Sequence, residues 1–121
     1  MSDYLPKFNL GGTARTKTAS ATVVGGQVVT QSGAVAGANA LDWAGVAGQD
    51  AASGQLITVY SEGVQYVVGA GAVAQGARVK CAANGQVTTW VSGTDVPDAL
   101  VGTAEEACSG AGVKFAVKFA R

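Results

Sequence analysis

The sequence predicts an all-β protein, a small barrel or sandwich of short strands, and three observations support this. Ala, Gly and Val make up 59 of the 121 residues, whereas there are five Leu and one Ile. Short apolar runs recur between Gly-containing turns, at the spacing of about 8 to 12 residues that is typical of sandwiches and barrels. The Ala-rich stretch 34–44 contains Gly37 and is flanked by Gly33 and Gly45, and each Gly costs a helix about 0.8 to 1 kcal/mol relative to Ala.

Residues 1–12 differ in composition from the rest of the chain and predict an extended N-terminal arm. A proline disfavours helix at the residue before it, and the segment ends at the flexible pair Gly11-Gly12. A disordered terminus is the alternative, but so many large apolar side chains are a poor composition for disorder. We therefore expect docking onto another subunit or a partner through Tyr4, Leu5, Pro6, Lys7, Phe8 and Leu10.

Residues 13–121 form the expected β domain. Glu62-Gly63 predicts a hairpin between the runs 56–61 and 64–68. In the last run, Phe115 and Val117 alternate with Lys114 and Lys118, which predicts a half-buried strand whose lysines protect a sheet edge. In chain order, strands are expected over residues 14–18, 21–24, 27–30, 56–61, 64–68, 77–82, 86–91, 100–104 and 113–119.

The β domain also contains a weak internal repeat, over about residues 21–61 and 72–119. Gly25 of the first segment aligns with Gly76 of the second, and Gly45 aligns with Gly102. We interpret this as one turn-strand unit used twice, with Gly where the chain needs a positive φ or a close approach. Helix is expected for one or two turns at most, near residues 50–52 or 105–107.

Several functional classes are excluded by composition. The chain has no His, so the usual general base and the commonest metal ligand are missing. Eight Lys and Arg balance eight Asp and Glu, which leaves no charge excess for binding nucleic acid. No apolar stretch reaches the length of about 20 residues that spans a membrane, and the first residues lack the pattern of a secretory signal. We expect no enzyme, no cofactor or metal, and neither a nucleic-acid nor a membrane partner.

The two cysteines and two tryptophans each leave two interpretations open. Cys81 and Cys108 match no metal spacing, and we favour two small buried thiols over a disulfide because thiols stay reduced in the cytosol. Trp43 is either an anchor at a subunit or capsid interface or a plug in the core. For Trp90, at the end of "QVTTW", we favour the core or a half-buried position over an interface.

Several motifs together resemble the head-decoration, or capsid cement, proteins of tailed bacteriophages. This resemblance covers about residues 20–119 and implies a compact β protein, usually a homotrimer. It also implies a subunit that is made in the host cytoplasm, sits on the exterior of the virion capsid and locks neighbouring major capsid proteins together, with no catalytic residues. The motifs are Gly45-Val46-Ala47, Ala51-Ala52-Ser53-Gly54, Gly63-Val64, the stretch 73–79 ("VAQGARV") and the stretch 102–107 ("GTAEEA").

Charge and loop composition suggest two further surfaces. Lys7, Arg15 and Lys17 make the first 20 residues net positive, which fits either contact with an acidic capsid surface or an ordinary solvated face. The alternative to a decoration protein is a surface-displayed β module that binds glycans or host molecules. Its candidate site would be the loop 92–99, but Asp95 and Asp98 alone are too few ligands for calcium, and we favour a plain connection.

Overall fold

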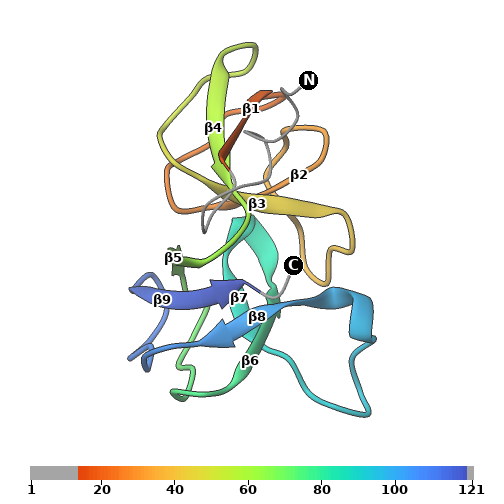
Figure 1. Cartoon of the computed structure of the whole chain (residues 1–121), viewed down its shortest axis with the longest axis vertical. Helices are drawn as coiled ribbons and strands as arrows, with labels where there is room; N and C mark the ends of the chain where they lie inside the picture. Colours follow the sequence, from red (N-terminus) through yellow and green to blue (C-terminus); the bar gives the residue numbers. More distant parts are fainter. Residues whose placement is uncertain (1–13, 120–121) are drawn as a thin grey trace, which may run out of the picture.

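The computed structural model describes residues 14–119 and shows an all-β fold, as predicted. The strands form two antiparallel sheets, the first in the upper part of Figure 1 and the second in the lower part. The first sheet has the order β1 (Ala14–Thr18), β4 (Leu56–Tyr60), β3 (Trp43–Ala47), β2 (Val28–Thr30). The second has the order β5 (Val64–Val68), β9 (Lys114–Phe119), β8 (Leu100–Ala104), β6 (Arg78–Cys81), β7 (Val87–Thr89).

The first half of the described chain, residues 14–61, supplies the first sheet, and the second half, residues 62–119, supplies the second. Equivalent hydrogen bonds recur in the two halves: Gly26 N–H donates to Ala47 O over 2.9 Å, and Gly76 N–H donates to Ala104 O over 2.8 Å. These bonds agree with the internal repeat that the sequence suggests. The repeat itself remains a proposal. The bonds match Gly26, rather than Gly25, with Gly76, so the register differs by one residue from the sequence alignment.

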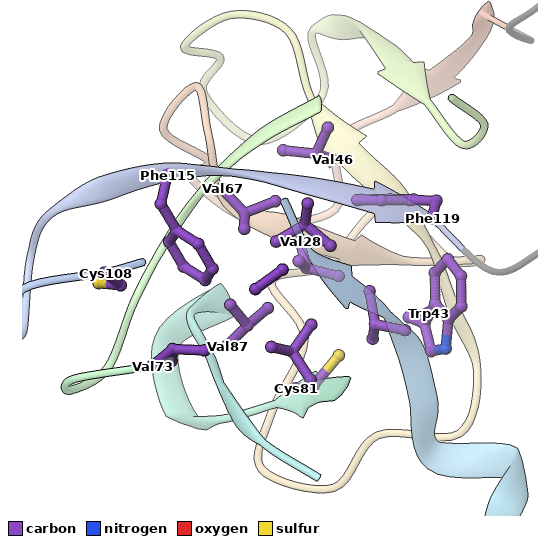
Figure 2. Packing of buried hydrophobic residues seen from close by; sticks show 14 of the residues in the cluster. Val28, Trp43, Val46, Val67, Val73, Cys81, Val87, Cys108, Phe115 and Phe119 are labelled. Atoms are coloured by element: carbon purple, nitrogen blue, oxygen red, sulfur yellow. The ribbon is translucent and has the colours of Figure 1, made fainter. Parts of the chain in front are cut away.

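Strand β3 is buried on both faces and joins two apolar cores. Trp43 and Val46 belong to the larger core, which takes residues from both sheets, whereas Ala44 and Ala47 belong to a smaller core formed by the first half. Figure 2 shows the larger core, where Trp43 meets Phe119 edge to face with ring centroids 5.6 Å apart. Apart from Trp43, the residues of β3 are small, as suits a strand that is packed from two sides.

Both cysteines are buried in the larger core and form no disulfide; Figure 2 labels them. Cys81 ends β6, and Cys108 pairs with Val73 in an isolated bridge. The Cys108 thiol lies 3.2 Å from the carbonyl oxygen of Gly110, to which it donates. Each therefore packs as a small apolar residue.

A β-bulge precedes a glycine in the central region of each sheet. Val29 pairs with Gly45 and Thr30 with Trp43, so one residue of β3 is extra. In the second sheet, Val79 pairs with Gly102 while Lys80 pairs with Leu100, so β8 has the same bulge. A Cβ on Gly102 would overlap the carbonyl oxygen of Lys118, and one on Gly45 would overlap that of Tyr60. The absent side chain lets two backbones approach closely.

Most of the expected strands are confirmed, but the hairpin prediction is wrong. Strand β4 lies between β1 and β3, so both of its edges are already hydrogen-bonded, and β5 instead pairs with β9. Residues 61–63 therefore connect the two sheets. Residues 21–24 contain an isolated bridge at Val23 in place of a strand. Strand β3 was not expected at all.

Two smaller predictions are also corrected. The short helical turns are η1 (Ala83–Gly85) and η2 (Pro97–Ala99), not residues 50–52 or 105–107. Lys114 and Lys118 are exposed while Phe115 and Val117 are buried, as expected, but β9 lies between β5 and β8. These lysines therefore do not protect an edge.

Asp95 anchors the loop that follows β7, through Lys80 of β6 and through the start of the loop. Lys80 Nζ lies 2.6 Å from Asp95 Oδ1, and Val91 N–H donates to Asp95 Oδ2 over 2.7 Å. The hydrogen bond from Lys80, followed by that from Val91, lowers the pKa of the Asp95 carboxyl below its ordinary value. Trp90 is half-buried; its Nε1 donates to Val96 O over 2.9 Å, and the Arg78 guanidinium lies 5.9 Å from its ring centroid.

Gly102→Ala is expected to lower the free energy of unfolding by about 1 to 3 kcal/mol, because the added methyl group forces β8 and β9 apart. Urea unfolding would measure the change. Gly37→Ala is the matched control, since Gly37 is exposed and a Cβ there meets nothing within 4 Å. Equal stability of the two variants would contradict the close approach at Gly102.

Asp95→Asn is expected to destabilise the fold at neutral pH, because Asn loses the charge that binds Lys80. The folded-state pKa of Asp95 lies below 3.8, so its contribution is complete above pH 3.8 and is lost as the pH falls through the lower folded-state value. Urea unfolding of both proteins at pH 7 and at successive values below 3.8 tests this. A stability difference that stays constant over this range would refute it, and Asp42→Asn, at an exposed carboxylate, is the control.

Candidate interaction surfaces

A groove of about 420 Å³ lies between the two halves and exposes two tyrosines. Tyr60 is the last residue of β4, and Tyr66 is the middle residue of β5. Their exposed fractions are 39% and 61%, high values for side chains with a large apolar ring. We call this the tyrosine groove; its other lining comes from residues 24–26 and 46–50 of the first half and from Gln65 and Lys114 of the second.

Strand alternation and a glycine position the ring of Tyr60. Ile57 and Val59 point into the smaller core, so Tyr60 lies on the outer face of β4. A Cβ on Gly48 would lie 2.6 Å from Tyr60 Cε2, which means that the ring occupies the space left by this glycine. The ring is therefore held against the backbone of the loop after β3, with one side toward solvent.

The polar groups around the tyrosine groove hold its walls in place. Asp50 Oδ1 accepts a hydrogen bond from Gly25 N–H over 2.8 Å. This bond connects the turn before β2 to the loop after β3. The Lys114 stem lies across from Gly26, where a Cβ would be 3.4 Å from Lys114 Cε. Asp50 and Lys114 thus flank two aromatic rings, a composition suited to contact with another protein.

The carboxylates of the described chain form no metal cluster, and those of Asp95 and Glu106 have structural partners. Within residues 14–119, no group of three or more Asp, Glu, Cys or His side chains could hold a metal ion. Glu106 Oε1 accepts a hydrogen bond from Ala116 N–H over 3.0 Å, so this carboxylate supports the sheet. Asp95, in the loop considered as a glycan site, is bound to Lys80 and Val91.

A second candidate surface is basic and lies on β1, an edge strand of the first sheet. Arg15 pairs with Val59 and Lys17 with Ile57, so both side chains extend from the margin of the smaller core. Arg15 is exposed, and half-buried Lys17 donates from Nζ to Gln31 O over 3.3 Å. We call these two residues the basic edge. Charges of this kind hinder unwanted strand pairing.

The remaining predicted interface residues are placed as follows. Trp43 is 3% exposed in the larger core, which is the core alternative of the two that the sequence left open. It is therefore not part of the surface of this chain. The residues Tyr4, Leu5, Pro6, Lys7, Phe8 and Leu10 lie outside the described residues.

The tyrosines of the groove were missed as candidate residues, although a signal for Tyr60 was present. In β4, "LITVY", Ile57 and Val59 alternate with the outward Leu56, Thr58 and Tyr60. An aromatic residue on the outer face of an alternating strand is a candidate for contact with a partner. Tyr66 has no such signal, because "VQYVV" is apolar at four of its five positions.

No helix within residues 14–119 is long and apolar enough to cross a membrane.

Comparison with known proteins agrees with the resemblance seen in the sequence motifs. The chain has the fold of the head fiber gp8.5 N base of bacteriophage phi29, with a TM-score of 0.63 and 20% sequence identity over 88% of this chain and 93% of that chain. Among proteins with curated descriptions, none matches the sequence. A model of the phage cement protein family matches residues 10–119. Because this match spans nearly the whole chain, the protein belongs to the phage cement protein family, whose members are structural proteins of the phage head.

Proposed function

We propose that this protein is a capsid decoration subunit that binds the outer surface of a phage head and stabilises contacts between major capsid proteins. The family match over residues 10–119 is the observation that carries the proposal. We further propose that the subunit acts as a homo-oligomer, a trimer as the family resemblance implies, and that it has a structural role and no catalytic one. The fold shared with a phage head fiber base supports a place on the head.

Assembly has a physical advantage for such a subunit. The buried side chains of the two cores are mostly Val and Ala, with Phe115 and Ile57 the largest of those with less than 2% exposure. Burial stabilises by about 25 cal/mol per Å² of apolar surface, so small side chains contribute less each than Leu or Phe would. Several subunits linked together bind a symmetric lattice through contacts that become intramolecular after the first. Modest single contacts then give strong binding.

The basic edge is the surface that we assign to the capsid. Arg15 and Lys17 lie on a free strand edge next to the first described residue, and no described carboxylate forms an ion pair with either. Together with Lys7 they form the basic N-terminal end of the chain. Attraction to an acidic capsid surface would increase the rate of encounter and would weaken with added salt.

The double variant Arg15→Glu and Lys17→Glu is expected to bind capsids about tenfold more weakly or worse at low salt, because two attractions become repulsions. Co-sedimentation with purified capsids over a range of salt concentrations measures this. Arg78→Glu with Lys118→Glu is the matched control, since it makes the same charge change on the outer face of the second sheet. Equal loss in both pairs would show a general charge effect and refute the basic edge.

Deletion of residues 2–12 is expected to abolish capsid binding while the β domain stays folded. The strands of the described fold begin at Ala14, so the deletion removes none of the sheet. Circular dichroism would report the fold, and co-sedimentation would report binding. Undiminished binding of the shortened chain would refute a role of the arm.

A further inference from the structure

The outer edge of β5 has two backbone positions that pair with no strand of the described chain. Phe119 N–H donates to Gly63 O over 2.9 Å and Gly69 N–H donates to Val113 O over 2.9 Å, at the two ends of the β5–β9 ladder. In an antiparallel pair the bonded residues alternate, so Gln65 and Val67 also face β9. The N–H and C=O groups of Val64 and Tyr66 therefore point away from the sheet, and no other strand of the described chain pairs with them. Beyond Tyr66, β7 takes up this edge, since Gly69 forms a parallel bridge with Val87.

The two equivalent edge strands of the halves differ in protection. The β1 strand pairs with β4 as β5 pairs with β9, and Thr16 occupies the place of Tyr66. Strand β1 carries the charges of Arg15 and Lys17, whereas β5, "VQYVV", carries none. Val64 and Tyr66 are also 51% and 61% exposed. The open part of β5, from Val64 to Tyr66, is uncharged and exposed, so it is a template for another strand; proteins usually block such edges unless they use them.

The tyrosine groove runs beside this edge, since Gln65 and Tyr66 contribute to its lining. Its volume of about 420 Å³ can take several apolar side chains of an added strand. Hydrogen bonds to the edge would supply affinity, and the two rings would select large apolar residues.

The N-terminal segment has the composition and the starting point to be that strand. The first described residue, Ala14, pairs with Tyr60, which lines the groove. Large apolar residues are frequent over residues 4–10. At about 3.3 Å per extended residue, these positions lie roughly 13 to 33 Å along the chain from Ala14. If extended, a segment of this length is long enough to reach the groove of a neighbouring subunit.

We propose that β5 and the tyrosine groove of one subunit bind residues 4–10 of a second copy of this chain as an added strand. The arm of each subunit would then hold the oligomer together. Its deletion would weaken capsid binding because separate subunits lose the gain from multivalent contact. Pro6 is compatible with this role. An added strand becomes the new edge of the sheet, and proline is tolerated in an edge strand where its nitrogen faces away from the neighbouring strand. The interaction is between copies of one chain, so it can be tested without capsids.

Two full-length variants separate the donor from the acceptor. The donor-deficient chain carries Tyr4→Ser, Leu5→Ser, Phe8→Ser and Leu10→Ser. The acceptor-deficient chain carries Tyr66→Pro, which removes one outward N–H and one ring at a site where the N–H does not bond to β9. Analytical ultracentrifugation should show that each variant alone associates about tenfold more weakly than the natural chain, or worse. An equimolar mixture should form a heterodimer, because an intact arm meets an intact groove.

Matched controls keep the result interpretable. Thr16→Pro makes the same backbone change at the equivalent position of β1 and should leave self-association unchanged. Tyr66→Lys leaves the backbone intact and should weaken association as well, so the test stands if Tyr66→Pro does not fold. Undiminished association of both Tyr66 variants would overturn the proposal. Mixed variants that remain monomers would also overturn it, since that result means that the arm binds within its own subunit or elsewhere.

Discussion

Burial of β3 on both faces is the constraint on which the rest of this structure depends. The strand shares Trp43 and Val46 with the larger core and Ala44 and Ala47 with the smaller one. Its centre is Gly45, where the carbonyl of Tyr60 leaves no room for a Cβ. A strand packed from two sides joins the first sheet to the second, and Trp43 is its one large side chain. This explains why a chain of this size can be so rich in Ala, Gly and Val and still have a continuous interior.

The same strand plan in both halves leaves two equivalent free edges, and they are equipped differently. The first, β1, carries Arg15 and Lys17, while the second, β5, carries exposed Val64 and Tyr66. Charge on one edge discourages strand pairing, and its absence on the other permits it. An arm that binds the open edge of a neighbour would join two different surfaces, and such a head-to-tail contact can close into a ring.

Much of the fold could be predicted from sequence because local patterns decide it. The runs that became β1, β4, β5 and β9 carry alternation or dense β-branched residues, which are local signals. Strand β3 could not be predicted, since "WAGVA" has no alternation when both faces are buried. The hairpin predicted at Glu62-Gly63 was wrong for a related reason. A turn signal is local and carries no information on strand order, and β4 is already paired with β1 and β3. Tyr66 became a candidate only when its strand proved to be an edge, a property of sheet order.

The distribution of aromatic residues connects folding with assembly. The chain has eight: three Phe, two Trp and three Tyr. Trp43, Phe115 and Phe119 fill the larger core, and Trp90 covers a loop. The two tyrosines of the groove lie outside both cores, and Tyr4 and Phe8 belong to the segment that we propose as the added strand. Aromatic residues contribute most per residue when they are desolvated at an interface. If these side chains bind other subunits, as we propose, assembly would add apolar burial that the small-residue interior does not supply.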